Sequence, residues 1–135
     1  MTVRQRSQAL VELALGMGAL MLVLAGLVAL SVVTAAELGL VAVAEEAAHA
    51  AALAGTPGQA AQRGHDRGLQ VGEGYALSNG SLGVTVNVNQ FGQGGRVDAT
   101  ATYSFTGHDV FLFGLTGLTL ARTHSEPVGQ HRSLP

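Results

Sequence analysis

The sequence predicts an α+β fold in which a long N-terminal helix carries a small antiparallel β-sheet on its outer half. Three observations lead to this prediction. An uncharged apolar stretch covers residues 13–36, apolar residues continue at helical spacing as far as Ala54, and apolar and polar residues alternate strictly over 84–89 and 96–105. With 135 residues, the chain has the length of a single compact domain.

The uncharged stretch lies between Glu12 and Glu37. As a helix it would extend for about 36 Å at about 1.5 Å per residue, and this exceeds the roughly 30 Å hydrocarbon core of a bilayer. A protein this small has too few other elements to cover an apolar helix on all sides. We therefore predict a transmembrane helix over residues 8–36, preceded by a basic leader over residues 1–7.

The charges that flank this stretch predict its orientation. Arg4 and Arg6 precede it, whereas Glu37 and Glu45 follow it and the next arginine is Arg63. By the positive-inside rule the N-terminus stays in the cytoplasm. The chain is thus predicted to be a single-pass protein of the cytoplasmic (inner) membrane, with its C-terminal region outside the cytoplasm.

The composition restricts the partners and the sources of stability. The chain has no cysteine, so stability must come from packing and not from disulfides. Its formal net charge of −2 gives no basic surface suited to nucleic acid. We expect the membrane as a partner, no nucleic acid, and no cofactor.

Beyond the membrane the helix is predicted to continue as a stalk over residues 37–55. Leucine, alanine and glutamate are good helix formers, and the first stop signal is the sequence Gly55-Thr56-Pro57-Gly58. We therefore expect one continuous helix from about Gln8 to Ala54. A small α+β extracytoplasmic region over 56–127 and a disordered tail over 128–135 would follow.

A second, weaker helix is predicted from Gln59 to Asn79. Four internal glycines weaken it, because each costs about 1 kcal/mol relative to alanine. Asn79-Gly80 reads as a turn.

Two strands, 82–89 and 96–105, are predicted to pair antiparallel through a glycine-rich hairpin, and 118–125 to form a third strand that ends by Pro127. A small sheet needs a helix to lie on, and the alanine-rich surface of 38–53 is suitable. The strand residues expected to face it are Val84, Val86, Val97, Ala99 and Tyr103.

The N-terminal decapeptide carries a more specific signal. It reads Arg6-Ser7-Gln8-Ala9-Leu10-Val11-Glu12-Leu13-Ala14-Leu15. This segment resembles the start of TadE-like proteins, pilin-like proteins of the tight-adherence pilus assembly system. In that family a basic leader ends in glycine, four residues follow, and a glutamate opens the apolar run. Ser7 stands here in place of the glycine.

The resemblance implies a pilin-like fold and a structural role as a minor pilin or pseudopilin, and not an enzyme. It implies cleavage between Ser7 and Gln8 by a prepilin peptidase, other pilus and pilin-like subunits as partners, and a place in the membrane or in the pilus. Glu12 would then be the fifth mature residue. In pilins the glutamate at this place is proposed to pair with the N-terminal amine of a neighbouring subunit.

Glu12 also has a simpler interpretation. A carboxylate near a helix start gains about 0.3–1 kcal/mol from the helix dipole. Against this, its place beside lipid is costly, by up to roughly 2.5–3.5 kcal/mol at the bilayer centre. Both interpretations stay open at this point.

A second function class is a secreted or membrane-tethered small binding domain. Val33-Thr34-Ala35 resembles a signal peptidase site after an apolar core, although this core is longer than the usual 7–15 residues or so of a signal peptide.

Other features have plainer interpretations. His65-Asp66 and His108-Asp109 are expected to be solvated loop residues, because they lack a third ligand or a nucleophile motif. Residues 110–118 are apolar, and either pack on the sheet or form a docking patch. Ala14 and Gly18, four residues apart, suit close helix packing.

Overall fold

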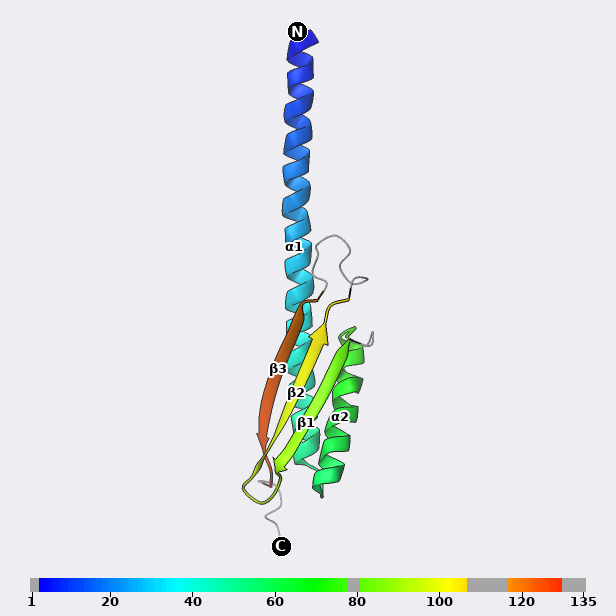
Figure 1. Ribbon diagram of the computed structural model, residues 1–135, viewed down its shortest axis with the longest axis vertical. Coiled ribbons are helices and arrows are strands. Elements are labelled where there is room, and N and C mark those ends of the chain that lie inside the picture. Colours follow the sequence, from blue (N-terminus) through cyan, green and yellow to red (C-terminus); the bar gives the residue numbers. More distant parts are fainter. Residues whose placement is uncertain (1–2, 78–80, 107–116, 130–135) are drawn as a thin grey trace.

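The computed structural model describes residues 3–77, 81–106 and 117–129. A long helix runs out of a small domain that is built from a second helix and a three-stranded sheet (Figure 1). In chain order the elements are α1 (Val3–Ala52), α2 (Pro57–Gly74), β1 (Leu82–Gln90), β2 (Arg96–Ser104) and β3 (Thr119–Pro127). The predicted α+β class, with a long apolar N-terminal helix and a small antiparallel sheet, is confirmed.

Helix α1 is continuous over 50 residues, which corresponds to a length of about 75 Å. Its continuity was predicted from the apolar spacing and from the lack of proline before Pro57. It begins at Val3, five residues before the predicted start, and ends at Ala52 instead of Ala54. Ser7 therefore lies inside the helix and does not cap it.

The C-terminal part of α1 forms the centre of the core. One stripe of its side chains is buried, at spacings of three and four residues: Ala36, Leu40, Val43, Ala44, Ala47, Ala48 and Ala51. This stripe faces β2, β3 and α2. The contact surface also extends further toward the N-terminus than the predicted 38–53, because Val32 and Val33 pack against the same core cluster.

Helix α2 begins at a well-formed cap. Thr56 accepts a hydrogen bond through Oγ1 from the backbone N–H of Gln59 at 3.3 Å, and Pro57 occupies the first turn. The helix ends at Gly74, before the predicted Asn79. His65 and Asp66 thus lie on a helix, and their prediction as loop residues is wrong.

The glycines of α2 have a packing role that the sequence reading missed. Ala60, Gly64, Gly68 and Gly72 recur every fourth residue and are buried. A Cβ added at Gly64 would lie 2.8 Å from the backbone oxygen of Ala47, and one at Gly68 would lie 2.8 Å from Val84 Cγ1. These glycines cost helix propensity, but they let α2 approach both α1 and β1 closely.

The sheet has the order β1-β2-β3 with both pairs antiparallel. The register places Val84 opposite Ala101 and Val86 opposite Ala99, so the predicted pairing is confirmed. The predicted inward residues also face the helices: four of the five are buried and Val86 is half-buried against the core. Helix α1 covers β2 and β3, while α2 covers β1.

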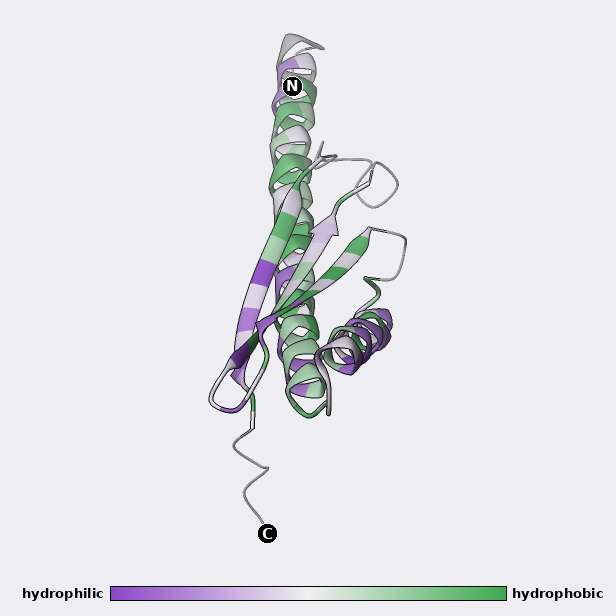
Figure 2. Cartoon of the chain, turned by 60° about the horizontal axis from the view of Figure 1, so that its bottom comes forward, coloured by the Kyte–Doolittle hydropathy of each residue, from purple (hydrophilic) through white to green (hydrophobic). Residues whose placement is uncertain are grey.

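The other face of the sheet is polar and hydrogen-bonded across the strands. Hydroxyls of Thr100 and Thr123 lie 2.8 Å apart, and Ser125 donates to Asp98 at 2.6 Å. In Figure 2 the outer turns of α2 are likewise largely hydrophilic, whereas the N-terminal half of α1 is mainly hydrophobic. The domain therefore presents polar surfaces, and the exposed apolar surface is concentrated on α1.

Candidate functional site: the bare segment of α1

The N-terminal half of α1 extends beyond the sheet (Figure 1). From residue 7 to residue 31 its side chains are exposed, apart from the half-buried Ala25 and Ala29; we call these residues the bare segment. Large apolar side chains point outward on every side of the helix, and Leu22 is 77% exposed. A soluble domain does not leave such a surface in water.

The bare segment has the dimensions of a membrane span. Within the described residues, α1 is the one helix long and apolar enough to cross a membrane by length and composition. Counted from Leu13, after the last charge, to Ser31, it has 19 residues and a length of about 28 Å, close to the roughly 30 Å hydrocarbon core.

The hydroxyl side chains at the end of this segment are satisfied within the helix. Ser31 Oγ donates to the backbone oxygen of Leu27 at 2.8 Å, and Thr34 Oγ1 donates to that of Leu30 at 2.9 Å. Sequence reasoning missed these bonds, although a serine or threonine in an apolar helix is the signal for them. They lower the cost of placing both residues in an apolar environment.

The three site residues predicted from the decapeptide all lie on α1. Ser7, Gln8 and Glu12 are exposed, and Gln8 and Glu12 occupy successive turns. Gln8 Nε2 lies 3.5 Å from Glu12 Oε1, at the long limit of a hydrogen bond. The carboxylate of Glu12 is therefore held only weakly within its own chain.

Ala14 and Gly18 lie on the bare segment, as the close-packing interpretation requires. A Cβ added at Gly16, Gly18 or Gly26 would meet no atom within 4 Å. These glycines thus face open space in the single chain, in contrast to the packed glycines of α2.

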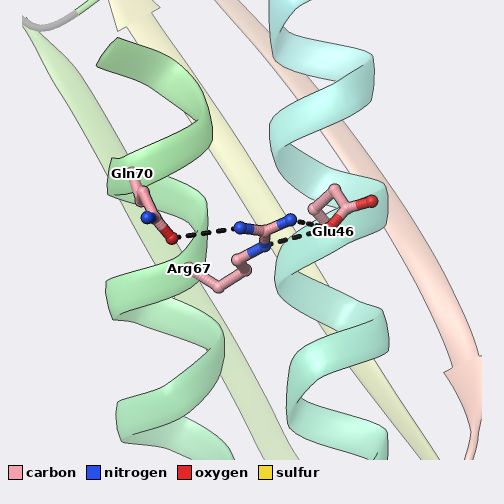
Figure 3. A network of polar contacts seen from close by, with 3 residues as sticks. All are labelled: Glu46, Arg67 and Gln70. Atoms are coloured by element: carbon pink, nitrogen blue, oxygen red, sulfur yellow. Dashed lines mark hydrogen bonds and ion pairs between the residues drawn. The ribbon is translucent and has the colours of Figure 1, made fainter. Parts of the chain in front are cut away.

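Ion pairs tie α1 to the rest of the domain. Arg67 of α2 donates to Glu46 through Nη2 at 2.8 Å and through Nε at 3.0 Å, and its Nη1 donates to Gln70 at 3.0 Å (Figure 3). Arg122 of β3 donates to Glu37 at 2.5 Å. These pairs were not predicted, because their members are far apart in sequence.

Three histidines of the described residues have polar contacts within the domain. His65 Nδ1 lies 2.9 Å from the backbone oxygen of Val84, on edge strand β1. His124 Nε2 and His49 Nδ1 lie 3.3 and 3.6 Å from different oxygens of Glu126.

In the part of the chain that the structure describes, no group of three potential ligand side chains is arranged to hold a metal ion. His108, Asp109, residues 110–116 and His131 lie outside the described residues.

The fold and the bare segment define a small α+β domain carried on a long helix with an exposed apolar half. No protein-family model matches the sequence, and neither a curated protein nor a solved structure matches the chain.

Proposed function

We propose that this chain is a structural subunit, a minor pilin or pseudopilin, that takes part in the assembly or anchoring of a tight-adherence pilus. The observation that carries the proposal is the combination of the bare apolar segment of α1 with a small domain packed on the same helix. The resemblance of the N-terminal decapeptide to TadE-like proteins supports the particular pilus system. The chain serves as a building block and catalyses no reaction.

The bare segment anchors the protein in the cytoplasmic membrane in this proposal. The arginines at positions 4 and 6 keep the N-terminus in the cytoplasm, and the domain lies outside. The polar outer face of the sheet and the polar side of α2 suit an aqueous environment.

Glu12 is the residue assigned to subunit assembly. Its carboxylate stands at the start of the apolar surface, where burial in lipid without a partner is costly, and Gln8 is a weak partner at 3.5 Å. Cleavage between Ser7 and Gln8 would create an amine at Gln8. The Gln8 amine of a neighbouring subunit would then pair with Glu12 and remove this cost.

The alternative, a secreted or tethered binding domain released by signal peptidase, fits the packing less well. Cleavage after Ala35 would remove Val32 and Val33, which pack against the core. The half of α1 that remains would begin at Ala36, a buried residue.

Replacing Glu12 by glutamine tests the assembly role. Glu12→Gln keeps the size of the side chain and removes its charge, so abundance and topology should stay normal. Losing one charge-assisted pair, worth about 1.5–3 kcal/mol, should reduce co-purification with pilus components about 10-fold or more. Glu45→Gln is the matched control, since Glu45 is also exposed on α1 but lies within the domain half.

Mass spectrometry should also identify the first residue of the mature protein, because the comparison of the two variants is meaningful only if the cleavage site is known. Gln8 as the first residue supports the pilin proposal, while Ala36 or Glu37 supports the secreted domain. Unchanged assembly in a correctly cleaved Glu12→Gln protein would contradict the intersubunit pair and leave Glu12 as a helix-start carboxylate.

A further inference from the structure

The corner of the domain nearest to the bare segment carries an exposed apolar side chain, Leu118. It precedes β3 directly and is 37% exposed. Its backbone is held in place, because its carbonyl oxygen accepts a hydrogen bond from the N–H of Phe105 at 2.9 Å. Phe105 belongs to the same core cluster as Val32 and Val33 of α1.

The level of Leu118 along α1 follows from the ion pair between Arg122 and Glu37. Leu118 precedes Arg122 by four residues, so it lies about 13 Å further along the extended chain. Figure 1 shows that β3 starts at the end of the domain nearest to the bare segment. The hydrogen bond to Phe105, a member of the core cluster against which Val32 and Val33 pack, places Leu118 near the level of those two valines.

The dimensions of a bilayer place the outer boundary of its hydrocarbon core at the level of Leu118. If the hydrocarbon core begins after Glu12, its roughly 30 Å takes up about 20 residues of helix and ends near Val32. The headgroup layer adds about 5–7 Å on each side, which reaches the level of Glu37. The core cluster begins at Val32, so the chain leaves no spacer between the membrane and the domain.

We propose that the corner around Leu118 inserts into the interface of the outer leaflet, so that the domain rests on the bilayer instead of projecting freely from it. The inference rests on the proposed membrane anchoring and adds a second, peripheral contact. The partner is the phospholipid bilayer at the boundary between acyl chains and headgroups. The charges at the level of Glu37 suit this position, because Glu37 and Arg122 neutralise each other within the headgroup layer.

Single-tryptophan variants of the full chain test this placement in vesicles. The chain has no tryptophan, so each variant carries one reporter. Leu118→Trp reports on the corner, Leu22→Trp on the middle of the bare segment, and Phe91→Trp on the hairpin at the far end of the sheet. The vesicles contain phosphatidylcholine brominated either near the headgroup or deep in the acyl chain.

We expect shallow bromines to quench the fluorescence of Leu118→Trp several-fold more strongly than deep ones, and deep bromines to quench that of Leu22→Trp more strongly. The fluorescence of Phe91→Trp should be insensitive to both, because this position packs against the core at the far end of the domain. Since the chain has no cysteine, Leu118→Cys labelled with a small environment-sensitive dye provides a second reporter if tryptophan disturbs folding.

The outcomes separate the two proposals. If lipid quenches the fluorescence of Leu22→Trp while the tryptophan of Leu118→Trp is open to an aqueous quencher, the peripheral contact is wrong and the membrane anchor is still supported. If Leu22→Trp is quenched but the reporter of Leu118→Trp is shielded from both lipid and water, a protein partner or a second copy covers the corner, and the bilayer contact is again wrong. Absence of lipid quenching in Leu22→Trp overturns the anchor together with the inference.

Discussion

Substitution of a packed glycine of α2 tests how closely the two helices approach. A Cβ at Gly64 would lie 2.8 Å from the backbone oxygen of Ala47, 2.9 Å from Val86 Cγ2 and 3.0 Å from Ala51 Cβ. One of these atoms belongs to the backbone of α1, so a side-chain rotation cannot relieve the contact. In Gly64→Ala the helices must move apart.

The magnitude of the effect is a difference between two terms. Overpacking costs about 1–3 kcal/mol, and alanine recovers up to about 1 kcal/mol of helix propensity. Because the backbone contact favours the upper end of the first range, we expect a net loss of about 1–2 kcal/mol. For a domain of this size that lowers Tm by about 5–15 °C.

The assay follows thermal unfolding of the full chain in detergent by the near-ultraviolet circular dichroism of tyrosine. Tyr103 is buried and its ring packs edge-on against Phe105 at 5.0 Å, so this signal reports on the domain and not on the bare segment. Gly74→Ala is the control on the same helix, since a Cβ there meets no atom within 4 Å. An equal or higher Tm for Gly64→Ala than for Gly74→Ala would refute the close packing.

Two further predictions use the same assay. Leu40→Ala removes a fully buried side chain and should cost about 2–5 kcal/mol of folding stability. Leu22→Ala, on the bare segment, should leave the domain's Tm unchanged. Similar losses of Tm in both variants would contradict the division of α1 into two halves. Arg67→Gln breaks a half-exposed pair with Glu46 and should cost less than about 1 kcal/mol, with the loss shrinking in high salt. Arg63→Gln, on the exposed side of α2, is its control, and a salt-independent loss in Arg67→Gln would show that the ion pair is not responsible.

The regular elements were predictable because their signals are local. Apolar spacing of three and four residues and the lack of proline before Pro57 indicated α1, and strict alternation indicated β1, β2 and the face that each strand turns toward the helix. The predicted processing site, Ser7 and Gln8, and the predicted assembly residue, Glu12, also came from a contiguous motif. The structure adds their positions on α1 and the weak contact between Gln8 and Glu12, while their roles stay predictions.

The interpretation of the α2 glycines shows where local reasoning fails. Propensity alone counts each glycine as a loss, but Gly64 and Gly68 lie where α1 and β1 come so close to α2 that an added Cβ would have no room. A sequence window around α2 contains no information on Ala47 or Val84. The loop assignment of His65 was wrong although the predicted helix from Gln59 to Asn79 contained this residue, because it was drawn from the lack of a ligand or nucleophile motif and not from the helical pattern.

The sequence by itself determined the α+β class, the strand faces and the apolar character of the first half of α1, because side-chain periodicity along one segment defines which face is buried. Only the tertiary structure decided where the domain begins to cover α1. The core starts at Val32, so the bare apolar length shortens to about that of a bilayer core. This boundary depends on how β3 and Phe105 dock on the helix, which is a contact between segments far apart in the chain.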